Sequence, residues 1–287
     1  MNTLCLHCYF NKHWESARAM GDDEKATAFS KALMRKFLEQ PDTVDSAYMG
    51  AVASQMFKEF YGSDPDGRKE EKEMSNRFVM ERLETIQKMI GESSDPLFAA
   101  LQFAILGNYL DFSALRGKVS FEKLEEMLRS ALDIQLDMDC YQALQADLAA
   151  GKRVLYITDN AGEIGFDRLF AEQMQKKYPH LEITFCVRGG PIVNDATRED
   201  AEEVGITFPV IDSGNAIGGM ELDLIGQEAK QAMETADVII AKGMGNTESL
   251  YDSGYNVYFA FLVKCARFEQ VFGKPMFTPM LVSEKRK

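Results

Sequence analysis

The feature that most constrains the fold is a change of pattern at Gly151. Beyond this residue the chain alternates between short apolar runs and longer segments whose apolar residues recur at helical spacing. The apolar runs are 154–157, 183–187, 210–211 and 238–241, and the helical segments between them are 166–177, 197–204 and 222–235. Strand-like runs that alternate with helices of this length predict βαβ units and a parallel sheet. A further run at 257–263 fits either a strand or a helix.

The part of the chain that precedes Gly151 shows no alternation with a period of two. Its helical segments are 26–38, 44–60, 68–90, 97–106, 121–128 and 138–148. We expect 68–90 to form one long charged helix, and 97–106 to be buried because it is apolar on nearly every face. The sequence therefore predicts a helical N-terminal domain, residues 1–150. A Rossmann-like three-layer α/β/α domain with a mainly parallel sheet follows, residues 151–287.

Composition excludes several classes of protein. The net charge of −13 argues against a nucleic-acid binder, which needs a basic face to neutralise phosphates. No apolar run reaches the roughly 20 residues that cross a bilayer, and residues 1–10 are too polar for a signal peptide. Five cysteines spread along the chain do not form a secreted disulfide framework. We expect a cytoplasmic protein without membrane or nucleic-acid partners, and its oligomeric state stays open.

Polar side chains stand where the predicted strands end. They are Asp159 and Asn160, Arg188 with Asn194 and Asp195 beyond it, Asp212, and Lys242. Each has an ordinary explanation: Asn194 or Asp195 as the N-cap of a helix that begins near residue 196, and Lys242 as a solvated side chain before a flexible loop. However, the carboxyl ends of parallel strands lie on one edge of a sheet, so these groups converge. Their convergence favours a functional site.

The convergent set suits phosphate chemistry. Asp159, Asn160 and Asp195 could hold one Mg²⁺-like ion through oxygen ligands. Lys242 and Arg188 could take the charge of a phosphoryl group. Phosphate-ester hydrolysis is the simplest inference. A non-catalytic module that binds a phosphorylated ligand or nucleotide is the alternative, although anion capture alone needs no carboxylate cluster.

Other phosphate-binding motifs do not fit the sequence. The turn at 160–165 lacks the first glycine of the dinucleotide fingerprint, and no segment carries the closing Gly-Lys-Ser/Thr of a P-loop. Haloacid-dehalogenase-like phosphatases place a second Asp two residues after the first, and that position is Ala161 here. The three histidines stand in no context that fits a Ser-His-Asp hydrolase. None of these mechanisms maps onto the chain.

Several segments together resemble one family. They are Asp-Asn-Ala-Gly-Glu at 159–163 with Asp167 beyond it, Arg188 with Pro191 and Asn-Asp-Ala-Thr at 194–197, Lys-Gly-Met-Gly-Asn at 242–246 with Glu248 and Leu250, and Gly-Asn-Tyr-Leu-Asp at 107–111. This pattern resembles the damage-control phosphatases, also catalogued as domain of unknown function 89, over nearly the whole chain. Cys5 and Cys8 resemble the Cys-x-x-Cys start of the prokaryotic-type subfamily.

The resemblance implies a divalent-metal-dependent phosphatase, a phosphoric monoester hydrolase, that acts on small phosphorylated metabolites such as sugar phosphates. The implied metal is Mn²⁺, Mg²⁺, Co²⁺ or Ni²⁺. The implied metal ligands are Asp159, Asn160 and Asp195, the implied catalytic residues Asp159, Glu163 and Lys242, and the implied substrate-binding residues Arg188, Asn194, Lys242, Asn108 and Asp111. A further family block is matched only loosely, by Asp64 to Asp66, Lys72 and Asn76, and we assign it no role.

The cysteine pair at the start of the chain stays open. Cys5 and Cys8 could form half of a zinc site, but no second pair stands at zinc-like spacing. Packed or simply reduced thiols are the favoured explanation of the pair.

Overall fold

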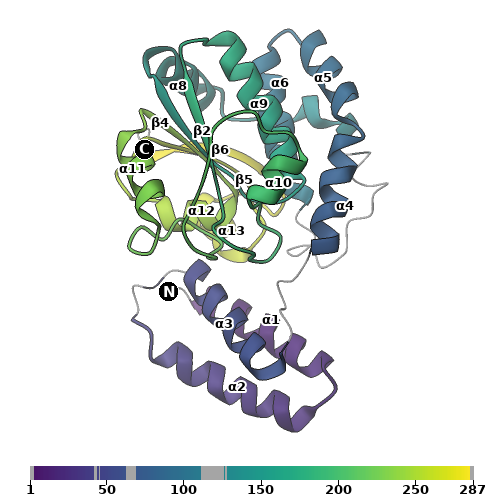
Figure 1. The fold of residues 1–287 in the computed structure, drawn as a ribbon, viewed down its shortest axis with the longest axis vertical. Coiled ribbons are helices and arrows are strands. Elements are labelled where there is room, and N and C mark those ends of the chain that lie inside the picture. Colours follow the sequence, from purple (N-terminus) through teal and green to yellow (C-terminus); the bar gives the residue numbers. More distant parts are fainter. Residues whose placement is uncertain are drawn as a thin grey trace.

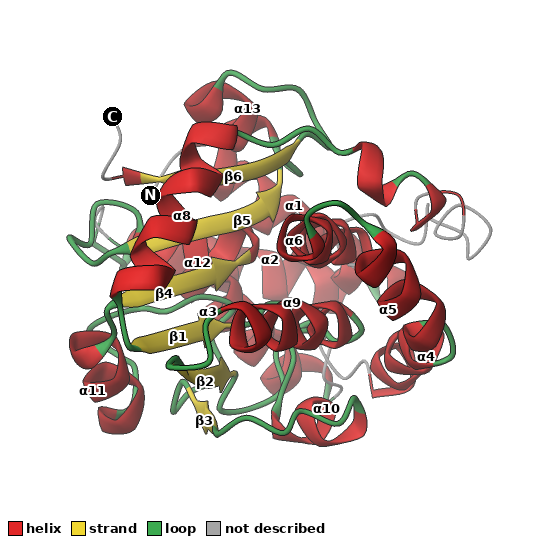
Figure 2. Ribbon diagram, turned by 90° about the horizontal axis from the view of Figure 1, so that it is seen from above, coloured by secondary structure: helices red, strands yellow, loops and turns green. Residues whose placement is uncertain are grey.

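A computed structural model of the protein describes residues 3–41, 44, 46–62, 69–110, 126 and 128–284. Within them, six strands form one sheet in the order β3-β2-β1-β4-β5-β6, and Figure 2 shows the strands side by side. Their bounds are Arg153–Ile157 (β1), Glu182–Val187 (β2), Val210–Asp212 (β3), Val238–Lys242 (β4), Val257–Leu262 (β5) and Pro279–Ser283 (β6). Strands β1 to β5 pair in parallel, and β6 pairs antiparallel with β5. The structure confirms the predicted α/β fold with a mainly parallel sheet.

Strands β1 and β4 are neighbours at the point where the strand order reverses. The chain runs from β1 outward through β2 to β3, then returns to β4 on the other side of β1 and runs outward to β6. At such a switch point an open sheet leaves a crevice at the carboxyl ends of its strands, and ligands bind there. The residues after β1 and the last residue of β4 therefore flank the crevice.

Helices cover both faces of the sheet, which is why the interiors of its central strands are apolar and buried. Successive residues of β1 point to opposite faces: Tyr156 joins the hydrophobic cluster on one face, whereas Leu155 and Ile157 join the cluster on the other. Every residue of β4 and β5 is buried. The sheet is thus the middle layer of three.

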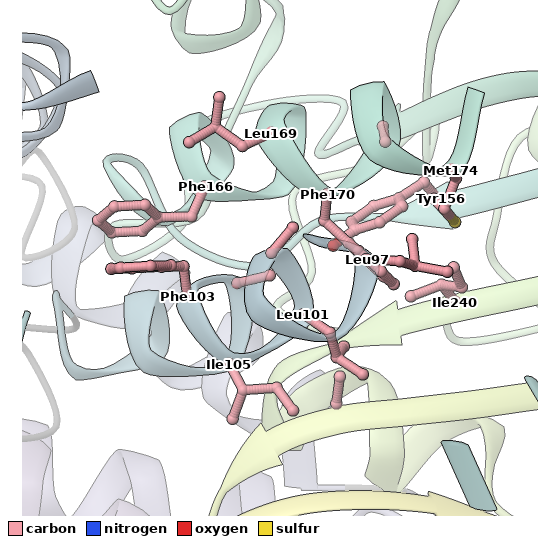
Figure 3. Packing of buried hydrophobic residues seen from close by; sticks show 14 of the residues in the cluster. Leu97, Leu101, Phe103, Ile105, Tyr156, Phe166, Leu169, Phe170, Met174 and Ile240 are labelled. Carbon is pink, nitrogen blue, oxygen red and sulfur yellow. The ribbon is translucent and has the colours of Figure 1, made fainter. Parts of the chain in front are cut away.

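One face of the sheet is covered mainly by helices from the first half of the chain. They are α4 (Lys69–Met80), α5 (Leu83–Glu92), α6 (Pro96–Leu106) and α8 (Met138–Ala150), joined by α9 (Glu163–Lys177) from the second half. Helix α6 is central: nine of its residues are buried, as its apolar sequence predicts. Asp95 caps it by accepting from the Phe98 N–H. Figure 3 shows Phe103 of α6 facing Phe166 of α9, with a ring-centroid separation of 6.3 Å.

Helix α10 (Arg198–Glu203) lies beside β3, and the two short 3-10 helices, η1 (Gly107–Leu110) and η2 (Ala131–Asp133), pack on α6. The second face of the sheet is covered by α11 (Gln227–Thr235), α12 (Gly243–Leu250) and α13 (Ala266–Phe272). The second hydrophobic cluster lies between the sheet and these helices, with Phe261 of β5 packed against Phe268 of α13. Helix α10 packs on α4 and α9 rather than on this face.

Three N-terminal helices form a small unit of their own below the sheet in Figure 1. They are α1 (Thr3–Ala19), α2 (Asp23–Leu38) and α3 (Ser46–Tyr61), and they share a separate hydrophobic cluster around Phe29 and Phe57. The start of α3 packs on α12, and the Ser46 hydroxyl donates a hydrogen bond to the Glu248 carboxylate. This unit therefore sits at the edge of the sheet where β4 ends.

Several sequence expectations need correction. The helix expected at 68–90 is two helices, α4 and α5, separated at Glu81 and Arg82. At this break the Arg82 N–H turns to the Val79 carbonyl, and the Arg82 guanidinium caps the Phe78 carbonyl at 2.8 Å, so the backbone groups stay satisfied without a continuous helix.

Other boundaries also differ from the expectation. The segment after Lys242 is helix α12 rather than a flexible loop, and α9 begins at Glu163 rather than near Phe166. The ambiguous run at 257–263 forms strand β5. The sequence pattern did not identify β6, an edge strand that begins with a proline. Helix α10 is capped by Thr197, not by Asn194 or Asp195.

Helices from before residue 150 share one hydrophobic cluster with the sheet. The division into domains at residue 150 stays a prediction. In the ranges described above, no helix combines the length and apolar character that a membrane crossing requires.

Candidate active site

Backbone hydrogen bonds join the loops that follow β1 and β2. The Ala161 N–H donates to the Asn194 carbonyl at 2.8 Å, and the Ala196 N–H donates to the Asp159 carbonyl at 2.7 Å. Asn160 and Asp195 form an isolated antiparallel bridge between the two loops. The structure thus brings the adjacent residues Asp159 and Asn160 next to Asp195, which lies 35 positions beyond Asn160 in the chain; these three are the expected metal ligands.

The Asp159 carboxylate rests against the start of α12. Gly243 has a φ of +78°, and a Cβ atom built on it would lie 2.1–2.5 Å from the atoms of that carboxylate. Glycine is needed here both for its left-handed backbone and for this close approach. The carboxylate Oδ2 accepts hydrogen bonds from Asn108 Nδ2 at 2.8 Å and from Asn160 Nδ2 at 2.7 Å. Its position is fixed from three sides.

The Asn160 side chain has a defined orientation. Its Nδ2 donates to Asp159 Oδ2 and, at 2.7 Å, to Glu163 Oε2. Because both donors of the amide are directed to carboxylates, its Oδ1 is turned to the opposite side. An amide oxygen held in this way beside two carboxylates is a suitable ligand for a hard cation.

Arg188 links Asp195 to α12 from a buried position. The residue is 2 % exposed, its Nε donates to Asp195 Oδ2 at 2.7 Å, and its Nη2 donates to Asn246 Oδ1 at 2.8 Å. Asn246 is itself held by the carbonyls of Thr158 and Lys242. Within the described ranges, Arg188 Nη1 has no hydrogen-bond partner. A buried guanidinium with one unused nitrogen has donors left for an anionic ligand.

Lys242 and Glu163 lie behind the ligands and are 0 % exposed. The Lys242 ammonium donates to Glu163 Oε1 at 2.6 Å, to Asp167 Oδ1 at 2.7 Å and to the Ala104 carbonyl at 2.7 Å. Burial by itself lowers the pKa of Lys242, but the two carboxylates outweigh burial, so the pKa is raised and the ammonium stays charged. All three of its N–H groups are used inside the protein.

The expected substrate-binding residues have different surroundings. Asn108, in η1, is completely buried: its Nδ2 bridges Asp159 and Glu163, and its Oδ1 accepts from the Leu262 N–H. Asn194 is buried in the loop next to Asp195. Asp111 lies outside the described residues. Asn108 therefore supports the site from within rather than from its surface.

A cavity of about 600 Å³ lies beside Arg188. Its lining includes Lys72 and Arg77 of α4, the backbone turn at Gly189 and Gly190, and Thr197. The cavity is large enough for a small metabolite.

Asn76 and Lys72, to which the sequence analysis assigned no role, support the loop that carries Asp159 and Asn160. Asn76 Oδ1 accepts from the Gly162 N–H at 2.6 Å, where Gly162 has a φ of +76°, and Asn76 Nδ2 donates to Asp200 and Glu203. Lys72 pairs with Asp200 at 2.7 Å. These contacts hold the turn between β1 and α9 against α4 and α10. The loose match to a family block was the only sequence signal for them.

The expected ligand set, Asp159, Asn160 and Asp195, consists of two carboxylates and one carboxamide. The part of the chain that the structure describes holds no group of three or more His, Cys, Asp and Glu side chains placed to bind a metal. Cys5 is buried and contacts the Arg267 guanidinium at 3.6 Å, and Cys8 is exposed. Among these residues nothing completes a zinc site around the cysteine pair.

The arrangement defines a class of α/β protein with polar ligands at the switch point of a parallel sheet, and comparison with known proteins identifies the family. Residues 1–277 match the model of the damage-control phosphatase ARMT1-like domain. The match covers most of the chain, so the protein belongs to the damage-control phosphatase family, as its sequence motifs predict.

Related proteins support this membership. A protein of Methanocaldococcus jannaschii described as uncharacterized, MJ0202, is 33% identical over 91% of this chain and 88% of its own length. A damage-control phosphatase of Archaeoglobus fulgidus is 29% identical over 92% of each chain. The crystal structure of a DUF89 family protein from Pyrococcus horikoshii, PH1575, superposes with a TM-score of 0.83 at 27% identity, covering 99% of this chain and 98% of that one.

Proposed function

We propose that the protein is a divalent-metal-dependent phosphatase that hydrolyses small phosphorylated metabolites such as sugar phosphates. The observation that carries the proposal is the meeting of Asp159, Asn160 and Asp195 next to the unused Nη1 of Arg188. Oxygen ligands for a cation and a buried donor for an anion stand at the same strand ends. Two relatives, the Archaeoglobus fulgidus protein and PH1575 of Pyrococcus horikoshii, are named damage-control phosphatases, which supports a phosphatase.

The residues fit one divalent cation. Asp159, Asn160 and Asp195 supply oxygens of the kind that Mg²⁺ and Mn²⁺ prefer, and Co²⁺ or Ni²⁺ accept the same set. A cation bound there would polarise the phosphoryl group and offset the negative charge of the transition state. It would also reverse the local field at the site, so that the net charge of −13 does not keep a phosphorylated substrate away.

The surrounding residues have separate tasks. Arg188 binds the phosphoryl oxygens through Nη1 while its Nε keeps Asp195 in place, and Asn194 stands beside it in the same loop. Asn108, Glu163 and Lys242 hold Asp159 and Asn160 from behind, because they are fully buried and bonded to one another. Residues around the cavity of about 600 Å³ would contact the rest of the metabolite. The Cys5 and Cys8 spacing supports membership in the prokaryotic-type subfamily.

The test is hydrolysis of p-nitrophenyl phosphate, followed as phosphate release, after removal of metals with EDTA and addition of Mn²⁺, Mg²⁺, Co²⁺ or Ni²⁺ singly. We expect one or more metals to restore turnover in the wild type and none to restore it in Asp159→Ala. The matched control is Asp139→Ala, which removes an exposed carboxylate on α8, away from the site. Equal turnover in the wild type and in Asp159→Ala would refute the proposal. Metal and phosphate binding without turnover would instead establish a binding module.

A further inference from the structure

Asp167 is a buried acid that the proposed function does not use. It lies one helical turn beyond Glu163 on α9 and is completely buried. Its Oδ1 accepts from Lys242 Nζ at 2.7 Å and from the Tyr156 hydroxyl at 2.8 Å. Its Oδ2 is buried and has no hydrogen-bond partner in the ranges that the structure describes. A carboxylate with one unsatisfied oxygen in an apolar core is costly to ionise.

The Lys242 ammonium connects Asp167 to the ligand set. Glu163 shares this ammonium through Oε1, and Glu163 Oε2 accepts from Asn160 Nδ2 at 2.7 Å and from Asn108 Nδ2 at 2.9 Å. Both amides also donate to Asp159 Oδ2. A continuous chain of hydrogen bonds therefore runs from Tyr156 in the core to the expected metal ligand Asp159.

One ammonium cannot neutralise two carboxylates at once. With Asp167 protonated, Lys242 and Glu163 form a neutral pair; with Asp167 ionised, the buried cluster carries one excess negative charge. The hydrogen bonds that Glu163 accepts from Asn160 and Asn108 differ in strength between these two states. When Asp167 is ionised, Glu163 shares the Lys242 cation with it and is the stronger acceptor.

We propose that Asp167 is a positioning residue of the phosphatase site, and that its protonation state acts on Asp159 and Asn160 through Lys242 and Glu163. This inference rests on the proposed function. The titratable groups that face Asp167 are Tyr156 on β1, Lys242 on β4 and Glu163 on α9, and α6 contributes only the Ala104 carbonyl to the cluster.

The chemistry of the cluster sets the pH range of the effect. Burial raises the pKa of Asp167, Lys242 lowers it and Glu163 raises it by a smaller effect, so that the pKa stands at about 7. The hydrogen bond from Tyr156 favours the ionised form and lowers this pKa. Removing the Tyr156 hydroxyl should therefore move the titration of Asp167 to higher pH.

The experiment measures kcat against pH with saturating Mn²⁺ for the wild type, Asp167→Asn and Tyr156→Phe, using phosphate release from p-nitrophenyl phosphate. We expect an inflection near neutral pH in the wild type, its disappearance in Asp167→Asn, and its displacement to higher pH in Tyr156→Phe. The matched control is Tyr141→Phe, which removes another buried hydroxyl that donates to Asp95 and should leave the inflection in place.

A profile of wild-type shape in Asp167→Asn would overturn the inference, even if the variant were less stable, because a purely structural role changes no inflection. If Asp167→Asn fails to fold, Tyr156→Phe decides: an unmoved inflection overturns the inference. If the wild type shows no turnover with any metal, the proposed function fails separately. Mn²⁺ affinity against pH, measured by calorimetry on the same proteins, then takes the place of kcat, and identical curves for all of them would overturn the inference.

Discussion

Arg188 and Lys242 are both buried cations, at the carboxyl ends of β2 and β4 on either side of β1. They differ in how many hydrogen-bond donors remain unused by the protein. Arg188 uses Nε for Asp195 and Nη2 for Asn246, and Nη1 keeps its donors. Lys242 donates its three N–H groups to Glu163, Asp167 and the Ala104 carbonyl. The guanidinium has five N–H donors, so it can bind protein groups and a ligand at the same time. The Lys242 ammonium has three donors, and all of them already bind protein groups.

This difference assigns the two cations to different tasks. Arg188 is suited to bind a phosphoryl group, and Lys242 is suited to keep the acids behind the ligands in place. The motif residues at two strand ends thus act at different distances from the substrate. Four variants test this contrast, beginning with the largest expected effect.

Replacement of Lys242 should have the largest effect on stability. Lys242→Met leaves Glu163 and Asp167 buried without their cation, and removal of one partner from a buried ion pair costs about 3–5 kcal/mol. Urea unfolding should show a loss of that size, together with loss of turnover. Lys230→Met, at an exposed position of α11, is the control and should change stability by less than about 0.5 kcal/mol. A stable Lys242→Met protein would contradict the role of Lys242 as the counter-ion.

Asp167 should make the folding free energy depend on pH. Its pKa is raised from 3.8 to about 7 in the folded protein, so folding takes up a proton between these values. Stability should therefore fall as pH rises from about 4 to about 7 and change no further above that, by on the order of 3 kcal/mol. Asp167→Asn should lose this part of the dependence when urea unfolding is compared at pH 5 and pH 8. An equal pH dependence in both proteins would argue against a protonated Asp167.

Arg188→Lys should affect substrate binding more than stability. A lysine keeps a charge near Asp195 but loses the fork that binds Asp195, Asn246 and a ligand together. We expect KM for p-nitrophenyl phosphate to rise about 10- to 100-fold, the equivalent of one or two charged hydrogen bonds. Steady-state kinetics with saturating Mn²⁺ separate KM from kcat. An unchanged KM would exclude Arg188 from the phosphoryl site.

Gly243→Ala should have the smallest effect on folding and a specific effect on the metal. A left-handed alanine costs about 1–2 kcal/mol, and its Cβ would displace the Asp159 carboxylate. The control is Gly273→Ala, which has a φ of +63° with nothing within 4 Å of the added Cβ. Gly243→Ala should lose at least as much stability as Gly273→Ala, because the displaced Asp159 carboxylate also loses its hydrogen bonds. Only Gly243→Ala should lose Mn²⁺ affinity, by about tenfold or more in calorimetry. Equal Mn²⁺ affinities of the two variants would mean that metal binding does not depend on the position of the Asp159 carboxylate against α12.

The positions that sequence reasoning located best are those set by topology. Asp159, Asn160 and Arg188 stand directly after strands, so their meeting follows once the sheet is parallel. Asp195 lies further along the same loop as Arg188, so its place at this edge of the sheet also follows from the topology. The α/β fold and the burial of α6 follow in the same way from the alternation of segments and from an apolar helix.

Contacts between distant segments could not be predicted in this way. Lys242 was expected to face the phosphoryl group, and its burial depends on the Ala104 carbonyl, 138 residues away. Asn76 reaches Gly162 across 86 residues. The break at Arg82 depends on the Arg82 side chain, which caps the preceding helix α4, and no proline or glycine marks this break in the sequence. Such features arise from tertiary packing, and only the folded chain shows them.

A crystal structure of the protein with Mn²⁺ and inorganic phosphate would show directly which residues bind the metal and which cation binds the phosphate. We expect the metal between Asp159, Asn160 Oδ1 and Asp195, a phosphate oxygen on Arg188 Nη1, and Lys242 still bonded to Glu163, Asp167 and Ala104. A phosphate bound by Lys242, or a metal held outside these three ligands, would contradict this expectation.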